Sequence, residues 1–166
     1  MRVLVAYESK YGSTKAIAER ISETLVAQHH DATVQPIEKL HDLAGYDAFV
    51  IGSAVYHGGW LDKAVDFVRN HELAFAGRPV WLFSSGPLGT SLPADPKELP
   101  ILRDATNARG HHVFYGALDR RNLSVGERLI AGVVKAPEGD FRDWTDIGTW
   151  AEGIARELDS VVLVTA

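Results

Sequence analysis

Residues 3–14 read VLVAYESKYGST, and this stretch decides the fold. The opening run VLVAY is apolar without helical spacing, which predicts a short buried strand. After the polar segment around Gly12, apolar residues recur at about every fourth position, as on one face of an amphipathic helix. A strand that runs through a hydroxyl-rich loop into a helix is half of a βαβ unit. The apolar positions of the helix are Ile17, Ala18, Ile21 and Leu25.

The rest of the chain repeats this alternation of strand and helix. Alternating elements imply a parallel sheet joined by right-handed crossovers. We therefore expect an α/β fold with three layers: a doubly wound, five-stranded parallel sheet of order 2-1-3-4-5, with residues 1–166 in a single domain. The expected strands are 3–7, 33–37, 48–53, 79–84 and 112–118, and the expected helices start near residues 14, 61, 99 and 147.

Composition excludes several classes of chemistry. The 166 residues contain no cysteine, so disulfides, thiolate metal sites and iron–sulfur clusters are excluded, and redox chemistry would need a bound cofactor. A net charge of −5 disfavours a general nucleic-acid binder. No apolar run reaches the length of a membrane span, and the first residues lack signal-peptide features, which predicts a cytoplasmic protein. The apolar run 161–164 leaves a peripheral membrane contact open.

An insert separates the fifth strand from the last helix. Residues 119–142 are far longer than a bare connection, which needs about 2–6 residues. Apolar residues at helical spacing inside the insert predict a short extra helix over one end of the sheet. The insert is also basic, and three of its arginines are candidate contacts for an acidic substrate: Arg120, Arg121 and Arg128.

The loop between the first strand and the first helix is a candidate phosphate site. Gly12 permits close backbone approach, and the helix N-terminus offers free N–H groups and a favourable dipole. The sequence has neither GxxxxGK[ST] nor GxGxxG, which favours a mononucleotide with a single phosphate. The alternative is a plain turn in which Ser13 caps the helix. The candidate residues are Ser9, Lys10, Tyr11, Gly12, Ser13 and Thr14.

Two further loops would meet the first one where the strand order reverses, between the first and third strands. One has flat side chains beside two glycines, and the other is rich in glycine, so together they suit a planar ring. The alternative is that the aromatic residues only seal the end of the sheet. The second loop contributes Ala54, Val55, Tyr56, His57, Gly58 and Gly59, and the third contributes Ser84, Ser85, Gly86, Pro87, Leu88 and Gly89.

These three loops together resemble the cofactor loops of the flavodoxin-like FMN-binding family. Within it the chain is similar to the branch that includes menaquinone-dependent protoporphyrinogen dehydrogenase, on residues 50–53, residues 115–118 and the basic insert. The resemblance implies non-covalent FMN and an oxidoreductase that takes hydride or electrons from a reduced substrate, such as protoporphyrinogen IX, and passes them to a quinone. The alternative is an electron-transfer flavodoxin that docks to redox proteins. Such carriers present a strongly acidic face, whereas this chain is only mildly acidic.

Other functions have weaker support. A phosphoacceptor receiver domain needs carboxylates at two strand ends, but the third strand ends in Ser53 and the first offers only Glu8. A serine nucleophile lacks a GxSxG elbow, and no histidine can be placed against Ser84 or Ser85. The adjacent histidine pairs 29–30 and 111–112 cannot share one face, so we expect them to be solvated and expect no metal site.

Overall fold

The central sheet is parallel and has the predicted order. A computed structural model describes residues 1–88, 94–119 and 138–165. Its long strands lie in the order β2-β1-β3-β5-β6, which is the predicted order 2-1-3-4-5 because a short strand, β4, intervenes in the numbering. The predicted α/β fold class is therefore confirmed. The five strands are β1 (Arg2–Glu8), β2 (Asp31–Pro36), β3 (Ala48–Tyr56), β5 (Val80–Ser85) and β6 (Gly110–Phe114).

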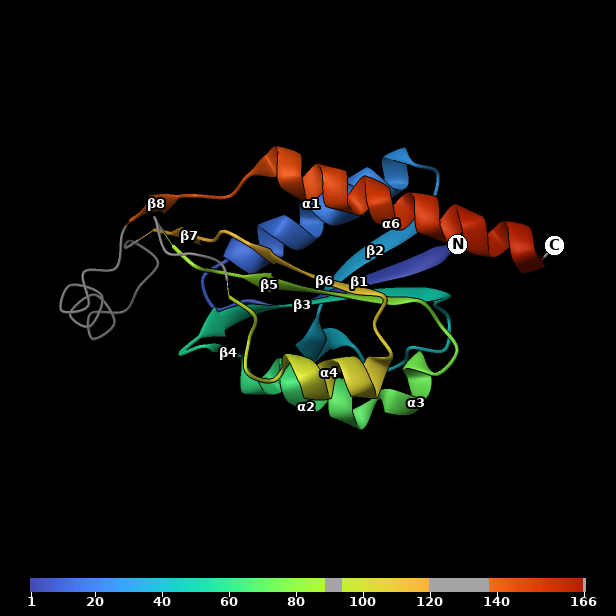
Figure 1. Cartoon of the computed structure of the whole chain (residues 1–166), viewed down its shortest axis with the longest axis horizontal. Helices are drawn as coiled ribbons and strands as arrows, with labels where there is room; N and C mark the ends of the chain where they lie inside the picture. The colour runs from blue at the N-terminus through green and yellow to red at the C-terminus, as the bar shows by residue number, and fades with distance from the viewer. Residues whose placement is uncertain (89–93, 120–137, 166) are drawn as a thin grey trace.

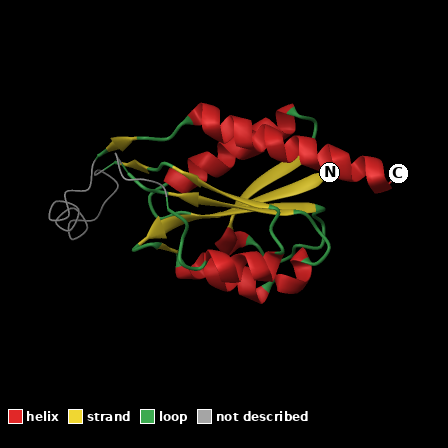
Figure 2. Ribbon diagram, in the orientation of Figure 1, coloured by secondary structure: helices red, strands yellow, loops and turns green. Residues whose placement is uncertain are grey.

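Helices cover both faces of the sheet and give the fold three layers (Figure 2). α1 (Ser13–Ala27) and α6 (Trp144–Thr165) lie together on one face. The other face is covered by α2 (Asp62–Asn70), α3 (Glu72–Phe75) and α4 (Leu99–Thr106), as Figure 1 shows, and the short turn η1 (Ile37–Lys39) follows β2. Within these described ranges, no helix is both long and apolar enough to cross a membrane.

Burial on both faces explains why the central strands are continuous apolar runs. Alternate residues of β1 point to opposite sides, so Val3 and Val5 pack towards α1 and α6 while Leu4 and Ala6 pack towards α2 and α4. All four side chains are fully buried. The two cores hold the sheet rigidly, and this rigidity fixes the positions of the loops that leave its carboxyl edge.

The predicted fifth strand, 112–118, is wrong in its second half. β6 ends at Phe114, and a separate strand β7 (Ala117–Leu118) pairs antiparallel with β8 (Gly139–Asp140), outside the main sheet. The chain turns away because the Gly116 N–H donates to the Pro87 carbonyl at 2.9 Å. The predicted helix of the insert falls on residues 120–137, outside the described residues, but the described base of the insert is this β7–β8 ribbon.

Two further features differ from the sequence expectation. The loop after β3 contains a tight hairpin, in which β4 (Gly59–Trp60) pairs back on β3. His57 and Gly58 turn the hairpin with positive φ angles of 50° and 74°, as a type I′ turn requires. The last helix is longer than its apolar spacing predicted, because α6 continues through the apolar run 161–164.

Candidate functional site

The three predicted loops meet at the carboxyl edge of the sheet. In the parallel register, Glu8 lies opposite Ser53, and Ser53 lies opposite Ser84, so β1, β3 and β5 end side by side. The strand order reverses at this edge, since β1 pairs with β2 on one side and with β3 on the other. Ligands of open α/β sheets bind at such a switch point.

The start of α1 is held by backbone and not by a side-chain cap. Gly12 occupies the N-cap position with φ 89°, a left-handed conformation that favours glycine. The Gly12 N–H donates to Ser9 Oγ at 3.1 Å, which ties the loop back on itself. No side chain caps the helix, so the alternative in which Ser13 is the N-cap residue is wrong. The N–H groups of the first helical turn have no partners within the helix and remain suited to an anion.

The Thr14 hydroxyl is buried without a partner. Thr14 is fully buried, and its Oγ1 makes no hydrogen bond within the described part of the chain. Such an unsatisfied hydroxyl costs about 1–3 kcal/mol, so native proteins retain few of them. An anion bound by the loop would accept the hydrogen and remove that cost. The residues of the first loop therefore fit a phosphate group.

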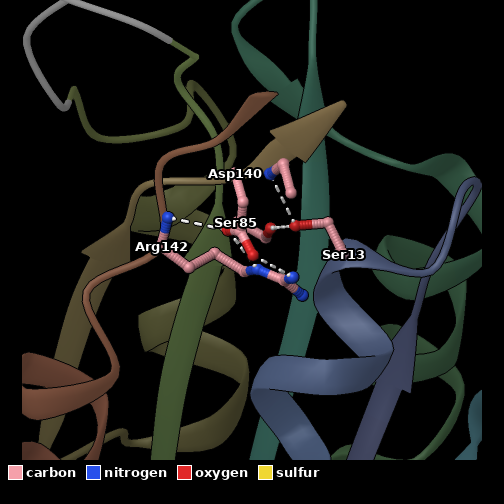
Figure 3. Close-up of polar contacts among 5 residues, drawn as sticks. Ser13, Ser85, Asp140 and Arg142 are labelled. Atoms are coloured by element: carbon pink, nitrogen blue, oxygen red, sulfur yellow. Dashed lines mark hydrogen bonds and ion pairs between the residues drawn. The ribbon is translucent and has the colours of Figure 1, made fainter. Parts of the chain in front are cut away.

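Ser13 joins three separate segments of the site, as Figure 3 shows. Its Oγ accepts the backbone N–H of Ala117 at 2.9 Å and lies 3.3 Å from the Ser85 Oγ. These contacts connect the first turn of α1 with the end of β5 and the start of β7. Ser13 thus fixes the three segments relative to one another before any ligand binds.

Aromatic side chains connect the first and second loops. The rings of Tyr11 and Tyr56 meet edge to face with centroids 6.3 Å apart. The Lys10 Nζ lies 5.2 Å from the Tyr11 ring centroid and 5.5 Å from that of Tyr56. Tyr11 also packs with Leu88 of the third loop against Leu118 of β7. Flat aromatic faces, one cation and an apolar wall therefore gather beside the phosphate loop.

The other residues of the second loop fall into two groups. Ala54 is buried and pairs with Ser85, and Val55 pairs with Trp60 across the hairpin. His57 and Gly58 are exposed at the hairpin tip, whereas Gly59 is buried. His57, with its positive φ of 50°, thus forms part of the hairpin turn.

The third loop extends the edge of the sheet by backbone pairing. The Gly86 N–H donates to the Phe114 carbonyl at 3.0 Å, and the Pro87 carbonyl accepts from Gly116. A Cβ atom on Gly116 would lie 3.4 Å from the Leu88 side chain and 3.5 Å from the Gly86 backbone, so the two segments pack closely. Gly89 lies outside the described residues.

Ser84 has a different environment from the rest of the loop. It is fully buried, and its Oγ accepts the Trp60 indole N–H at 2.8 Å. The same oxygen lies 2.8 Å from His111 Nε2, although the sequence alone gave no histidine for this serine. Asp95 contacts the other ring nitrogen of His111, so Ser84, His111 and Asp95 follow one another as serine, histidine and aspartate do in a hydrolytic triad. Because Ser84 is buried under Trp60, its hydroxyl is not an accessible nucleophile.

The expectation that the paired histidines are solvated is wrong for one member of each pair. His30 is buried, with Nε2 3.4 Å from the Ala155 carbonyl oxygen and 3.6 Å from a carboxylate oxygen of Asp159. The His111 side chain is only 1% exposed, and burial lowers its pKa below the ordinary value. Among the described residues no three acidic or histidine side chains gather as a metal site would require.

The structure also brings an ion pair to this edge that the sequence reasoning did not single out. Arg142 donates from Nε and Nη2 to the two carboxylate oxygens of Asp140, at 2.8 and 2.6 Å (Figure 3). These bonds hold the pKa of Asp140 below its usual value. The Phe141 N–H donates to the Gly116 carbonyl, which ties this segment to the connection between β6 and β7. The sequence feature that could have indicated this ion pair is the spacing of Asp140 and Arg142, two residues apart. The predicted contacts Arg120, Arg121 and Arg128 lie outside the described residues.

Comparison with solved structures supports the fold. The chain superposes on rubredoxin oxygen:oxidoreductase from Desulfovibrio gigas with a TM-score of 0.68 at 15% identity, covering 96% of this chain and 36% of that one. The superposition on a mutant flavodoxin from Pseudomonas aeruginosa has a TM-score of 0.62 at 16% identity and covers 96% of this chain and 99% of the flavodoxin. The superposition on a flavodoxin from the domain Archaea has a TM-score of 0.56 at 21% identity and covers 82% of this chain and 96% of the flavodoxin. The chain thus spans about a third of the first protein but nearly the full length of the two flavodoxins.

The fold and the loops define a doubly wound α/β protein with the N-terminus of α1 at its switch point. Residues 4–145 match the family model described as Flavodoxin domain. The chain therefore belongs to the flavodoxin-domain family. Flavodoxins bind FMN, which agrees with the cofactor predicted from the loops. No curated protein matches the chain in sequence.

Proposed function

We propose that this protein binds one FMN non-covalently and acts as an FMN-dependent oxidoreductase. The observation that carries the proposal is the Thr14 hydroxyl, which is buried at the start of α1 and finds no hydrogen-bond partner among the described residues. A phosphate oxygen in the loop 9–14 would accept its hydrogen and would meet the positive end of the α1 dipole. Family membership supports FMN as the nucleotide.

Each loop has its own task in this proposal. Residues 9–14 hold the phosphate, while residues 54–59 and 84–89 hold the ring. Bound FMN would supply the ability to accept hydride or electrons and to pass them on. Tyr11 and Tyr56 offer aromatic surface beside the phosphate loop, against which a bound ring would pack. Ser13 keeps the first and third loops in a fixed relation, so little order has to be gained on binding.

The proposed electron donor is a reduced organic compound, and the proposed acceptor is a quinone. Protoporphyrinogen IX is the substrate hypothesis, because the basic insert would attract its propionates. In that case Arg120, Arg121 and Arg128 contact the substrate. Replacing Arg120 and Arg121 by Ala should raise KM for the porphyrinogen and leave FMN affinity unchanged. A similar loss of FMN affinity would contradict a substrate role for the insert.

The second candidate function is electron transfer between redox proteins. It is favoured by the near-complete coverage of flavodoxins, such as 99% of the length of the one from Pseudomonas aeruginosa. Docking to a charged protein is steered electrostatically and weakens with salt, whereas turnover of a small molecule depends less on salt. Reduction rates measured with a flavodoxin reductase, from low to high ionic strength, separate the two candidates.

The first test is a pair of titrations followed by visible absorption, one with FMN and one with riboflavin. The two ligands share the ring and differ in the phosphate. We expect a shifted flavin spectrum with FMN and binding at least tenfold weaker with riboflavin, because a single charge-assisted phosphate hydrogen bond contributes about 1.5–3 kcal/mol. Absence of FMN binding would refute the proposal. Equal affinities for the two flavins would refute the phosphate site.

A further inference from the structure

A continuous chain of polar contacts runs beneath the ring-binding loops. The Asp95 carboxylate lies 3.2 Å from His111 Nδ1, and His111 Nε2 lies 2.8 Å from Ser84 Oγ. Ser84 Oγ in turn receives the indole N–H of Trp60 at 2.8 Å. Ser84 is fully buried and Trp60 is 4% exposed, whereas the Asp95 side chain is 68% exposed. The chain of contacts therefore leads from the surface to the base of the β3–β4 hairpin.

The chemistry of the four groups fixes the direction of every bond. An indole N–H can only donate, so it occupies a lone pair of Ser84 Oγ. The Ser84 hydroxyl hydrogen is then available to His111 Nε2, and the remaining imidazole hydrogen, on Nδ1, faces the Asp95 carboxylate. This is the arrangement in which all four groups are satisfied, and it requires neutral His111. Protonated His111 would donate to Ser84 from Nε2, and the Ser84 hydrogen would lose its acceptor.

Trp60 links this polar chain to the hairpin. Its backbone pairs with Val55, and its own N–H donates to a Glu98 carboxylate oxygen at 3.1 Å. The Gly58 carbonyl accepts the Lys97 N–H at 2.9 Å. A Cβ atom on Gly59 would lie 2.6 Å from Glu98 Oε1, so the hairpin sits directly on the start of α4. Displacing the indole would therefore displace the whole hairpin.

We propose that Asp95, His111 and Ser84 are positioning residues that hold Trp60, and through it the β3–β4 hairpin, in the conformation that receives the flavin ring. The inference rests on the proposed function, because the hairpin carries residues 56–59 of the ring-binding loop. The polar chain acts on the ring and not on the phosphate, since the phosphate loop opens α1 and its hydrogen bonds in the described structure lead elsewhere, joining Gly12 to Ser9 and Ser13 to Ser85 and Ala117.

The charges around His111 give the hairpin a dependence on pH. Asp95 favours the proton on His111, whereas Arg103 of α4 and the neighbouring His112 of β6 oppose it. Burial opposes it most strongly, so the pKa of His111 lies below the ordinary histidine value of 6.5. His111 is therefore neutral at pH 7, and the hydrogen bonds are intact. Acidification protonates His111, which leaves the Ser84 hydrogen without an acceptor and should weaken the hold on Trp60 before the fold is lost.

The test compares four variants that act on the chain in different ways. His111→Phe keeps a ring at this position but removes the contacts with Ser84 and Asp95. Asp95→Ala removes the carboxylate at the exposed end of the polar chain, where a substitution should not prevent folding. His111→Gln keeps an acceptor for Ser84 and cannot titrate. His112→Phe is the matched control, because His112 is on the same strand but bonds Asp146 at 2.9 Å and stacks on Trp150 on the opposite face.

Affinities for riboflavin and FMN, measured from about pH 8 to about pH 5, give the decisive comparison. We expect His111→Phe to weaken both flavins about five- to tenfold, which corresponds to one lost buried hydrogen bond, and Asp95→Ala to weaken both two- to fivefold. The ratio of the two affinities should stay constant. His111→Gln should bind as the wild type does at pH 8 and lose the decline at low pH. His112→Phe should match the wild type at pH 8 and, unlike His111→Gln, keep the decline at low pH.

Two results would overturn the inference while leaving FMN binding intact. One is wild-type riboflavin affinity in both His111→Phe and Asp95→Ala, and the other is an equal loss in His112→Phe. A second readout does not depend on the cofactor: the indole N–H signal of Trp60, assigned by its absence in Trp60→Phe, should shift with pH in the wild type and stay fixed in His111→Gln. If the wild type binds no FMN, the proposed function fails, and an indole signal that ignores His111 would then refute the positioning chain as well.

Discussion

Replacement of Thr14 by Val tests the phosphate loop most directly, because the same change should act in opposite directions on stability and on binding. Valine has nearly the shape of threonine, so the packing at this fully buried position is kept. In the protein without cofactor the change removes a buried hydroxyl that has no partner. We expect the free energy of unfolding to rise by about 1–2 kcal/mol, the cost of an unsatisfied buried hydroxyl.

In the complex with FMN the same substitution removes a donor to a charged oxygen. Such hydrogen bonds contribute about 1.5–3 kcal/mol, which corresponds to a loss of FMN affinity of roughly 10- to 150-fold. Riboflavin has no phosphate, so its affinity should not change. Thr14→Ser is the control: it keeps the hydroxyl and loses a methyl group, and should retain most of the FMN affinity.

The assay is fluorescence or absorbance titration with the two flavins, together with urea unfolding of each variant without ligand. Opposite shifts, with higher stability and weaker FMN binding in Thr14→Val, would be the signature of a residue kept for binding at the expense of stability. Unchanged FMN affinity would refute the assignment of residues 9–14. Parallel losses for FMN and riboflavin would mean that Thr14 supports the fold of the site and does not contact phosphate.

Three further predictions concern the surrounding structure. Gly52→Ala should destabilise the protein by about 3 kcal/mol in urea unfolding, because the added Cβ would lie 2.1 Å from the Phe83 ring; a change below about 1 kcal/mol would contradict this packing. As the pH falls, the unfolded chain takes up a proton on His111 before the folded protein does, because burial lowers the pKa of His111 in the folded protein. The free energy of unfolding should therefore fall as the pH drops below 6.5, and His111→Gln should remove this part of its pH dependence. Arg142→Met should raise the pKa of Asp140 towards its ordinary value in an NMR titration, and an unmoved pKa would exclude the ion pair.

The sheet could be predicted from the sequence because its strands are buried on both faces. Runs such as 3–7 and 48–53 have no polar interruption, so both their positions and their parallel order follow from the pattern. The two-residue strand β4 is too short to leave such a pattern. The break after Phe114 was missed because the apolar run continues through it, and the cause is a backbone bond from Gly116 to a distant loop.

The candidate site was predictable only as far as its loops. The strand–loop–helix pattern located the loop 9–14, within which α1 begins at Ser13. The contact between Ser84 and His111 depends on the register of β5 and β6, in which His111 lies opposite Leu82. Register cannot be obtained from apolar runs, because strands buried on both faces can slide without exposing an apolar side chain. The sequence likewise cannot show that the Thr14 hydroxyl lacks a partner among the described residues, because this depends on which other segments of the fold pack around it.

The ribbon of β7 and β8 has a consequence for how this protein can change. Leu118 and Gly139 lie opposite each other, so everything between them leaves and returns at one point. A segment attached in this way can be exchanged for a shorter or longer one at little cost in loop-closure entropy, because its two ends are already paired. The Ala117 N–H, however, is bonded to Ser13 at the start of α1. The ribbon is thus a natural grafting point, at which a new segment would be joined directly to the loop proposed to bind phosphate.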